Sequence, residues 1–422
     1  MTAALGRLNS RTFASFRSFN YRLFFAGQAV SQTGSWMQRI ALGWFVYQLT
    51  HSPFAVGLMA FAQFLPFMVF GLFAGVLTDR LDARRTVIGT QAAQLVSASA
   101  LAWIALGGFA QPWMLYVIAL VNGTVLVLDV PSRQQLTYRM VGRDVLPNAI
   151  ALNSSLFNAS RIFGPALAGT VYGFTGAGVC FLLNAISFLA VLLSLFAMRV
   201  GEFFPLETFE RPPILAGTRE GLAFARRNHR MVVLLVLTLL LSTFSFNFNV
   251  TLPVLAARTL HTDAQVYGLL SALFGGGALV GALAAASLGR ASTRVMLLGS
   301  LVFTGAELLL APLRSPLGAG ILLFFVGVGF TAWSANSNAI VQLQAPDRLR
   351  GRVIGLYFYA FNGTGALAGL FAGWLCAAGG TELAFAVGGV VGLVATLGAA
   401  TQLLRRRPPR LELRRRAEPQ AA

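Results

Sequence analysis

Two acidic side chains lie deep inside long apolar stretches of this sequence, Asp129 and Glu307. A carboxylate in low-dielectric surroundings prefers its neutral form, so either residue can carry a proton through an apolar layer. Arg133 follows Asp129 by four residues, so a structural ion pair is the alternative for that acid. Pro131 lies between them and loosens the helix, which can let such a pair open. Both acids are proton-coupling candidates, and a hydrogen-bonded structural acid is the alternative for Glu307.

Other polar residues recur at helical spacing, so that each group shares one helical face. Polar groups are expensive in lipid, and such faces therefore line a cavity or contact another helix. The groups are Gln28, Gln32, Ser35 and Arg39; Asn122, Asp129 and Arg133; Ser154, Asn158, Arg161 and Pro165; Ser242, Ser245 and Asn249; and Thr331, Ser334 and Asn338. Arg39 and Arg161 give a cavity positive character unless Asp129 neutralises one of them. Surplus arginine favours anionic or polar ligands over hydrophobic cations.

Other kinds of chemistry find no support in the residue pattern. The three histidines, His51, His229 and His261, are scattered without metal-ligand spacing. No Walker A sequence is present, and Gly327-x-Gly329 lies in an apolar run with no strand before it, which excludes a dinucleotide fingerprint. A membrane-embedded enzyme would need a convergent nucleophile, a metal set or paired carboxylates. We therefore expect no cofactor, no metal and no enzymatic activity.

The elements that position these residues must be membrane helices. Of the 422 residues, 56% are hydrophobic and 11% are charged, whereas soluble proteins carry about 25% charged residues. Such a chain cannot cover its surface with polar groups in water. Its long apolar runs indicate helices rather than barrel strands. The two cysteines are too few for a disulfide scaffold.

We predict an all-α membrane protein with twelve transmembrane helices, because a span needs about 20 apolar residues. The predicted spans are residues 21–48, 54–78, 86–108, 113–137, 148–174, 179–198, 231–256, 265–288, 295–312, 317–341, 353–376 and 383–404. Helix breakers such as Ser52-Pro53 and Ser315-Pro316 separate them. Phe188, within the sixth span, is expected to face lipid.

The basic residues predict the orientation in the membrane. All 32 are arginine, which is typical of a GC-rich bacterial genome. Arg258 and Arg314 lie in loops of one side, and Arg39 and Arg161 lie within spans. The others lie in the N-terminal segment, every second loop and the C-terminal tail, which predicts that both termini are cytoplasmic. The basic clusters behind the net charge of +18 are thus interpreted as topology signals that lie near anionic lipid, and not as a site for nucleic acid.

A charged stretch at 199–230 divides the predicted spans into two sets of six. A shift of 204 positions aligns 148–152 with 352–356 and 168–169 with 372–373. A shift of 211 aligns 56–58 with 267–269. These matches support two six-helix halves in parallel repeat. The predicted divisions are a cytoplasmic N-terminal segment (1–19), a first half (20–198), a cytoplasmic central loop (199–230), a second half (231–404) and a basic cytoplasmic tail (405–422).

The loop after the second predicted span carries a recognisable signature. It reads Gly75-Val-Leu-Thr-Asp79-Arg80-Leu-Asp82-Ala-Arg84-Arg85 and resembles the signature G-x-x-x-D-R-x-G-R-R of the major facilitator superfamily. We call the matching residues the gating motif: Gly75, Asp79, Arg80, Arg84 and Arg85. The signature's internal glycine is Asp82 here, so its tight turn is expected to differ, and the corresponding second-half loop has only Arg290 and Arg294.

The gating motif has a physical role that can be stated from its position. A carboxylate at Asp79 can accept hydrogen bonds from the N-terminus of a neighbouring helix and pair with arginine. Such a contact forms in one conformation and breaks in another, which makes a latch between the halves. The alternative is that these charges only set the orientation.

Further stretches resemble the drug:proton antiporter branch of this superfamily, which holds the enterobactin exporter and macrolide efflux proteins. These stretches begin at Asn20, Ser31, Asp129 and Asn158. The last includes Gly164, Pro165 and Gly169 and is similar to the antiporters' helix-five motif. The resemblance implies a twelve-helix fold, alternating access and proton-driven export. It also implies that spans one, four, seven and ten line the central cavity.

The leading hypothesis is a secondary exporter of a small molecule, such as a drug, a siderophore or a similar amphiphile, across the bacterial inner membrane by alternating access and proton antiport. The expected partners are the substrate, protons and the lipid bilayer, and the chain is expected to act as a monomer. A lipid or lysolipid flippase with a lateral opening is the alternative within transport. A non-transporting scaffold or receptor is the alternative of another class, and it would not need polar faces on cavity helices.

Overall fold

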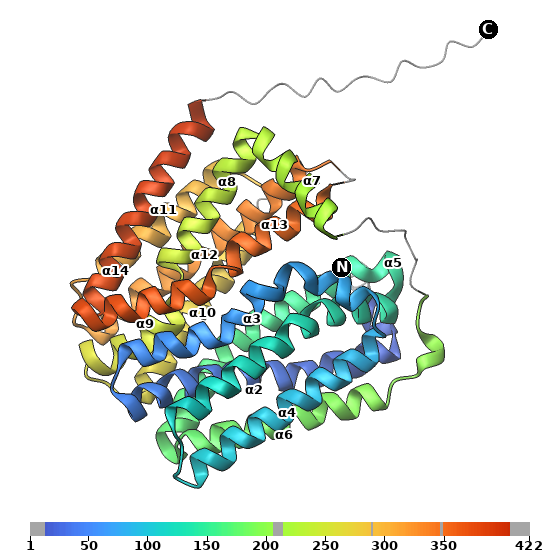
Figure 1. The fold of residues 1–422 in the computed structure, drawn as a ribbon, viewed down its shortest axis with the longest axis horizontal. Coiled ribbons are helices and arrows are strands. Elements are labelled where there is room, and N and C mark those ends of the chain that lie inside the picture. Colours follow the sequence, from blue (N-terminus) through green and yellow to red (C-terminus); the bar gives the residue numbers. More distant parts are fainter. Residues whose placement is uncertain (1–12, 206–213, 288–289, 347–348, 406–422) are drawn as a thin grey trace, which may run out of the picture.

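The computed structural model of the protein describes residues 13–205, 214–287, 290–346 and 349–405, and within these ranges it consists of helices and connecting turns (Figure 1). The first helices are η1 (Ala14–Arg17), α2 (Phe19–Thr50), α3 (Pro53–Asp79), α4 (Ala83–Leu106), α5 (Pro112–Thr175), α6 (Ala177–Phe196) and η2 (Val200–Glu202). The remaining helices are α7 (Ile214–Arg227), α8 (His229–Leu240), η3 (Leu241–Ser245), α9 (Phe248–Val254), η4 (Leu255–Thr259), α10 (Ala264–Ser287), α11 (Thr293–Leu310), α12 (Pro316–Gln344), α13 (Arg350–Asn362) and α14 (Gly365–Arg405). Residues 1–12 of the predicted N-terminal segment and 406–422 of the predicted basic tail lie outside the described residues.

Within the described ranges, nine segments are long and apolar enough to cross a membrane. Three of them contain breaks. The helix α5 is not helical at Gly142, and the segment His229–Thr259 is interrupted at residues 246–247. The segment Arg350–Leu404 is interrupted at residues 363–364, between α13 and α14, and again at Gly379 and Gly380. The polar face of α2 lowers its hydropathy, so that this long helix is not among the nine. The helices are thus consistent with the predicted twelve spans, and the exact number stays a prediction.

Short polar side chains begin many of these helices. Each N-cap side chain accepts a hydrogen bond from a backbone N–H in the first turn, which satisfies a donor that the helix leaves free. Caps of this kind are Ser18, Asp82, Asn228, Ser292 and Ser315. Pro112 and Pro316 occupy the first turn of α5 and α12, where the missing N–H is not needed.

The first set of helices, α2 to α6, and the second set, α8 to α14, repeat one another in detail. His51 and His261 follow the first crossing of each set, with φ of 51° and 50°, and no other non-glycine residue of the described chain has positive φ. Gly176 and Gly380 share extended ψ with φ of 82° and 70°, and they are related by the same shift of 204 positions. These equivalent turns support the parallel repeat, while the division into two six-helix halves stays a proposal.

The two sets meet at two close glycine contacts, which we call the glycine crossings. At one, Gly57 of α3 lies against Gly369 and Gly373 of α14, and a Cβ on Gly57 would lie 2.6 Å from the carbonyl oxygen of Gly369. At the other, Gly268 of α10 lies against Gly169 of α5, and a Cβ on Gly268 would lie 2.7 Å from the Cα of Gly169. The shift of 211 positions relates Gly57 to Gly268, and the shift of 204 positions relates Gly169 to Gly373. The two crossings therefore occupy equivalent positions of the repeat. Only glycine allows backbones to approach this closely.

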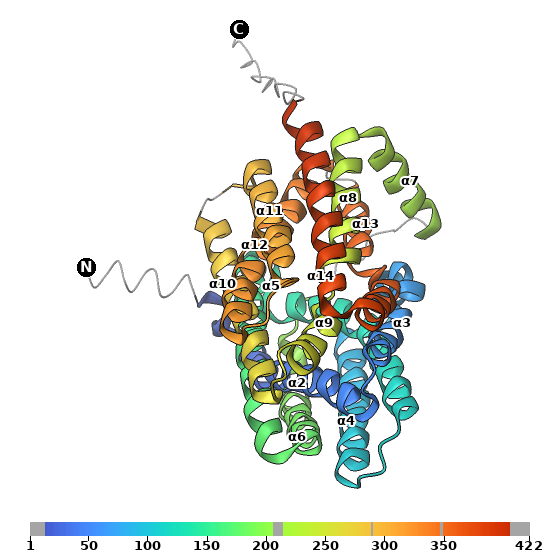
Figure 2. The same ribbon diagram turned by 90° about the vertical axis from the view of Figure 1, so that its left-hand side faces the viewer.

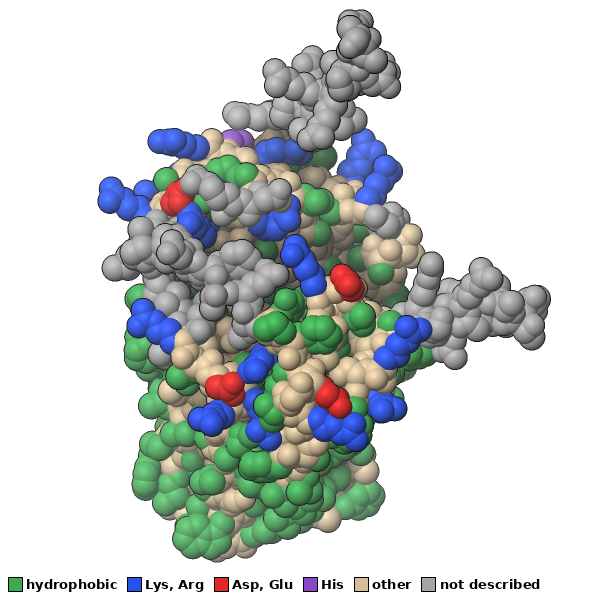
Figure 3. All heavy atoms as spheres, turned by 90° about the vertical axis from the view of Figure 1, so that its right-hand side faces the viewer, with side chains coloured by type: hydrophobic (Ala, Val, Ile, Leu, Met, Phe, Trp, Pro, Cys, Tyr) green, Lys and Arg blue, Asp and Glu red, His purple; other side chains and the backbone are tan. Residues whose placement is uncertain are grey.

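The arginine-rich face lies at the other end of the bundle (Figure 3). Arginines gather there from the turn between α3 and α4, the break at Gly142, the end of α6 and the helix α7. We call the opposite face, which holds the glycine crossings, the arginine-poor face. From these crossings, the helices of the two sets run toward the arginine-rich face at an angle to one another (Figures 1 and 2).

The expectation that Phe188 faces lipid is wrong. Its side chain is 2% exposed and belongs to a buried apolar cluster formed by residues of α2, α4, α5 and α6. Asn184, Ser187 and Ser194 share one face of α6 and are buried with Phe188, so the polar residues of this span mark the face that packs against the bundle. On the same helix, Leu193 is 69% exposed and is the better lipid-facing reference.

Candidate functional site

A buried polar network joins α2, α4 and α5. Asp129 is 2% exposed, and its Oδ2 lies 2.6 Å from Nε of Arg133, so the ion pair expected from their spacing is formed. Its Oδ1 accepts hydrogen bonds from Oγ1 of Thr90 at 2.6 Å and Nε2 of Gln91 at 3.0 Å. Arg133 also donates through Nη1 to Oε1 of Gln28 on α2. Three helices therefore supply partners to one carboxylate and its arginine.

Thr90 and Gln91 lie outside the polar faces predicted from the sequence. With Gln94 and Ser97 they form a polar stripe at helical spacing on α4, which the predictions did not include. Gln91 is fully buried, and its Oε1 has no hydrogen-bond partner among the described residues. The available signal was this polar stripe inside a predicted membrane span, since polar groups in lipid are costly without a partner.

Arg39 and Arg161 lie together where α2 and α5 face the second set of helices. Arg161 is 8% exposed, and its guanidinium carbon lies 4.5 Å from the ring centroid of Phe274 and 5.2 Å from that of Phe330. Arg39 lies 4.5 Å from the ring centroid of Trp36, which Arg161 approaches at 5.8 Å. Both guanidinium groups therefore approach the same ring, so their like charges lie near one another. We call Arg39 and Arg161 the arginine pair.

No carboxylate of the described chain forms an ion pair with either member of the arginine pair. Asp129, the acid that might have neutralised one of them, is paired with Arg133 instead. Aromatic faces attract a cation through their quadrupole and so stabilise these charges in part. The centre of the bundle therefore keeps positive charge that aromatic rings shield but no acid balances.

The second set of helices presents aromatic rings opposite the arginine pair. The rings of Phe246 and Phe330 stack with centroids 4.3 Å apart, and Phe330 lies 6.0 Å from Phe274 and 6.2 Å from Phe361. We call these four residues the aromatic wall. Phe246 and Phe361 also line a small pocket, together with Asn249 from the predicted polar face.

Glu307 is buried between α11, η3 and α14. It is 2% exposed and hydrogen-bonded to Ser245, whose hydroxyl donates to the carbonyl oxygen of Gly388 at 2.8 Å. Gly388 leaves room for the carboxyl group, because a Cβ there would lie 2.5 Å from Oε1 of Glu307. Its Oε2 has no hydrogen-bond partner. Ser245, a predicted cavity residue, therefore faces Glu307.

The remaining predicted cavity residues are half-buried along the central helices. They are Gln32, Ser35, Asn122, Asn158, Ser334 and Asn338. Their hydrogen bonds run within one set of helices: Asn158 donates to the carbonyl of Ser154 at 2.9 Å, and Asn338 accepts from Gln342 at 2.7 Å. Their contribution to a cavity stays a prediction.

The gating motif lies at the turn between α3 and α4 on the arginine-rich face. The structure does not describe the exposure of Gly75 or the side chain of Asp79, and the side chains of Arg80 and Arg85 are exposed. Arg84 donates through Nε and Nη2 to the last-turn carbonyl of Leu195 on α6, at 3.0 and 2.8 Å. These contacts lie within the first set of helices, so a latch between the sets stays a proposal.

Asp82, which replaces the signature's glycine, caps the N-terminus of α4. Its φ is −69°, its Oδ1 accepts from the N–H of Arg85 at 2.9 Å, and its Oδ2 pairs with Arg139 at 2.9 Å. Burial alone would raise the pKa of Asp82, but the Arg85 N–H and the Arg139 guanidinium together hold that pKa below its ordinary value. The turn differs from a glycine turn because a capping acid needs no positive φ.

The helix-five motif packs α5 against both sets of helices. A Cβ on Gly164 would lie 2.4 Å from Cβ of Trp36, so α2 and α5 touch at this glycine. Gly169 forms one of the glycine crossings, and a Cβ on Gly268 would lie 2.6 Å from the carbonyl oxygen of Pro165. The motif therefore provides backbone contact within the first set and across to the second.

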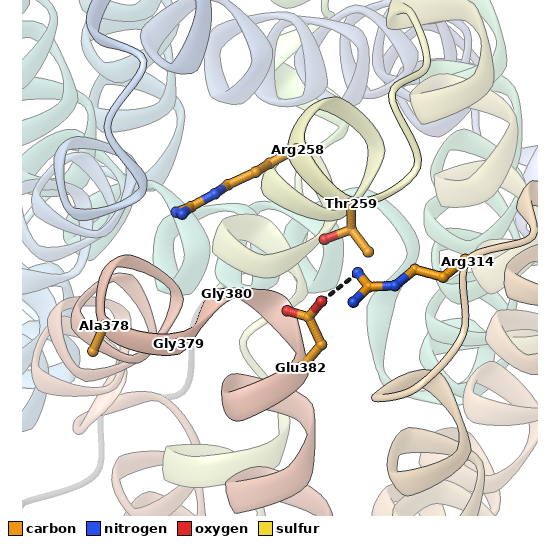
Figure 4. Close-up of a pocket in the computed structure, with 7 residues that line it drawn as sticks. All are labelled: Arg258, Thr259, Arg314, Ala378, Gly379, Gly380 and Glu382. Carbon is orange, nitrogen blue, oxygen red and sulfur yellow. Dashed lines mark ion pairs between the residues drawn. The ribbon is translucent and has the colours of Figure 1, made fainter.

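Aromatic and charged side chains complete the arginine-poor face. Trp44 of α2 stacks on Tyr267 of α10 with ring centroids 5.5 Å apart, which joins the two sets beside the glycine crossings. In the second set, a pocket opens around the break in α14 (Figure 4). There Arg314 pairs with Glu382, while the side chain of Arg258 points away from this pair. Arg258 and Arg314, the two arginines predicted to lie in loops of the arginine-poor side, thus line one pocket.

The sequence matches a family described as transmembrane secretion effector over residues 10–414. The chain is 27% identical over 405 residues to the uncharacterized MFS-type transporter YfiS of Bacillus subtilis (strain 168), with 88% of this chain and 91% of YfiS covered. It is 23% identical to macrolide efflux protein A of Streptococcus pyogenes, with 80% and 85% covered. It is 22% identical to the staphyloferrin A transporter of Staphylococcus aureus (strain NCTC 8325 / PS 47), with 79% and 84% covered.

Solved structures share this fold. The crystal structure of the nucleoside transporter NupG superposes with a TM-score of 0.74 at 13% identity, covering 92% of this chain and 100% of NupG. At that identity the likeness concerns the fold alone. With nine apolar segments in the described ranges and the family match along most of the chain, the protein is a multi-pass membrane transporter that belongs to the transmembrane secretion effector family of the major facilitator superfamily.

Proposed function

We propose that the protein exports a small molecule, such as a drug, a siderophore or a similar amphiphile, by alternating access between two six-helix halves. The glycine crossings and the Trp44–Tyr267 stack close the arginine-poor face, and the helices diverge toward the arginine-rich face. Because an excess of arginine marks the cytoplasmic side, we assign this conformation as closed on the side opposite the cytoplasm, with both termini in the cytoplasm. A relative named macrolide efflux protein A supports a small-molecule cargo and outward transport.

Proton antiport through Asp129 is the proposed energy source, and the network around Asp129 is the observation that carries it. Protonation of Asp129 would remove one charge of its pair with Arg133 and free that arginine to move. Because Thr90, Gln91 and Gln28 hold the same pair, the change would act on α2, α4 and α5 together. A carboxylate that links three helices is therefore suited to couple proton binding to a conformational change.

Glu307 is the second candidate for proton binding. The single hydroxyl hydrogen of Ser245 is directed to Gly388, so the bond between Ser245 and Glu307 forms when the carboxyl group carries the proton. Since no ion pair opposes it, we propose that Glu307 stays protonated through the cycle and that Asp129 switches.

The lipid bilayer is the proposed surrounding, and the bacterial inner membrane is the proposed location. Large apolar side chains such as Trp103, Leu193 and Leu317 are exposed on the outside of the bundle, as lipid contact requires. Both sets of helices belong to one chain, so a monomer suffices for the proposed cycle.

The test of export is the accumulation of a panel of macrolides, dyes and siderophores in cells with and without the protein. We expect at least one compound to accumulate less when the protein is present, and an uncoupler to restore its accumulation. Equal accumulation for every compound contradicts export, whereas export that survives the uncoupler contradicts proton coupling.

The gating-motif latch has its own test. Asp79→Asn and Arg80→Ala should leave membrane insertion intact but slow transport, because the inward-closed state loses a contact between the halves. The accessibility of introduced cysteines from each side should shift at the same time. Unchanged flux together with unchanged accessibility removes the latch from the mechanism.

A further inference from the structure

We propose that the arginine pair binds the anionic head of an amphiphilic substrate, whose apolar body lies against the aromatic wall. This inference rests on the proposed function, since it names the class of molecule that the exporter carries. It goes further in assigning one end of the substrate to each set of helices.

The electrostatics of the arginine pair require an anion. A guanidinium inside a bilayer is costly even when no other charge is near it. Here the like charges of two such groups lie near one another, and within the described residues neither has an acid partner. A bound anion between Arg39 and Arg161 relieves both penalties at once. The other charges described inside the first set are those of Asp129 and Arg133, and these two neutralise each other in an ion pair.

The geometry of arginine narrows the kind of anion. A guanidinium offers planar, forked donors that match the two oxygens of a carboxylate, sulfonate or phosphate. Arg161 is buried, whereas Arg39 is half-buried. The pair thus combines one anchored donor with one that the substrate can approach from the centre of the bundle.

The aromatic wall defines the other end of the substrate. Phe274 and Phe330 lie directly against the guanidinium of Arg161, so the cationic and aromatic surfaces are continuous. Phe246 and Phe361 extend the aromatic surface toward the small adjoining pocket. A flat or apolar body placed there is removed from water and stacks on the aromatic rings.

A substrate held in this way touches both sets of helices. Its head contacts α2 and α5, and its body contacts α10, α12 and α13. Only a ligand with different contacts in the two conformations can shift their balance. The same charges repel hydrophobic cations, so the site discriminates by charge as well as by shape.

The test measures binding to the purified full-length protein in detergent by equilibrium dialysis with radiolabelled naphthalene-1-acetate. Unlabelled naphthalene-1-acetamide and 1-naphthylmethylamine serve as neutral and cationic competitors of the same shape. We expect the anion to bind at least about tenfold more tightly than the amide, which corresponds to about 1.4 kcal/mol. The amine should compete least. Equal binding of anion and amide overturns the inference.

Variants locate the anion preference within the chain. Arg39→Gln and Arg161→Gln should each reduce the preference for the anion over the amide at least about tenfold. If Arg161→Gln does not fold, Arg39→Gln still tests the site, because Arg39 is less buried. The matched control is Arg226→Gln, which removes the same charge from an exposed position on α7 and should leave the preference unchanged. Equal losses in Arg39→Gln and Arg226→Gln overturn the inference.

An anionic head with an apolar body occurs both in soluble compounds and in lysolipids. Competition by lysophosphatidylglycerol but not by lysophosphatidylcholine, lost in Arg39→Gln, supports the site with a lipid ligand. Competition by neither lysolipid supports it with a soluble ligand, provided that naphthalene-1-acetate binds as expected. Competition by both lysolipids alike, with no charge preference, overturns it.

The outcomes also separate this inference from the proposed function. Uncoupler-sensitive export of some compound, combined with no charge preference in binding, leaves the proposed function standing and removes the anion site. A charge preference that depends on Arg39 and Arg161, combined with no uncoupler-sensitive export, keeps the site and removes proton-driven export.

Discussion

The two sets of helices share a backbone plan but carry opposite chemistry at their centres. In the first set, Asp129 is tied to Arg133 and to two donors of α4. In the second set, Glu307 has a hydroxyl partner, Ser245, and one oxygen without a partner. The first set also contributes the arginine pair, and the second contributes the aromatic wall.

The difference shows which features the repeat retains and which it does not. Glycine crossings and left-handed turns recur at equivalent positions, because close backbone approach and positive φ admit few residue types. The side chains at the centre have no such backbone constraint. They are free to become a charged network in one set and an aromatic surface in the other.

The largest expected effect concerns the two acids. Asp129→Asn should permit downhill exchange of substrate but abolish uphill export driven by a pH gradient, and Glu307→Gln should do much less. Removing one charge of a buried ion pair costs up to about 3–5 kcal/mol, so Asp129→Asn should also be the less stable variant. Reconstituted vesicles with an imposed pH gradient measure the transport. Full uphill export by both single variants and the double variant removes proton coupling through these acids.

A second prediction uses the feature that the two sets share. Gly57→Leu and Gly268→Leu should each open the arginine-poor face, because a side chain at a glycine crossing meets backbone atoms. Overpacking of this kind typically costs about 1–3 kcal/mol. The measurement is the rate at which a thiol reagent added on the arginine-poor side labels Asn249→Cys, in a protein in which Cys180 and Cys376 are replaced.

Gly276→Leu is the matched control for the glycine crossings, since it lies on the same helix as Gly268 with open space around it. It should leave the labelling unchanged. Similar effects of Gly57→Leu and Gly268→Leu would support the equivalence of the crossings. An effect at only one of them would show that the repeat is not functional there.

A third prediction compares the gating-motif loop with its reduced counterpart in the second set. Arg84→Ala should lower the free energy of unfolding by about 1.5–3 kcal/mol, because it removes charged hydrogen bonds to the carbonyl of Leu195. Arg294→Ala, at an exposed position of the corresponding loop, should change it by less than about 0.5 kcal/mol. Thermal unfolding of the purified variants measures both, and equal shifts would contradict the contrast.

The smallest expected effect is the pH dependence of the Asp82 cap. Because the folded-state pKa of Asp82 lies below its ordinary value, its contribution is present above the unfolded-state pKa and is lost as the pH falls through the folded-state pKa. The carboxylate is partly exposed, so the contribution stays below about 1 kcal/mol. The difference in unfolding midpoint between the parent and Asp82→Asn should shrink from pH 6 to pH 3. A difference that grows on acidification contradicts the cap.

The sequence by itself determined the membrane class, the helical fold and most helix ends. These follow from composition, apolar run length, caps and breakers, which act through neighbouring residues. The pairing of Asp129 with Arg133 was accessible for the same reason, since a spacing of four residues brings side chains together on any helix. The glycine matches between the halves were also visible, because a repeat preserves positions that need glycine.

Only the tertiary structure decided how the helices turn their faces toward one another. It brings Thr90 and Gln91 to Asp129 and directs Ser245 to Glu307. It also leaves Arg39 and Arg161 without an acid and sets them against the aromatic wall. The rotation of an apolar helix about its axis depends on packing with helices far away in the sequence, and local periodicity carries no record of those partners.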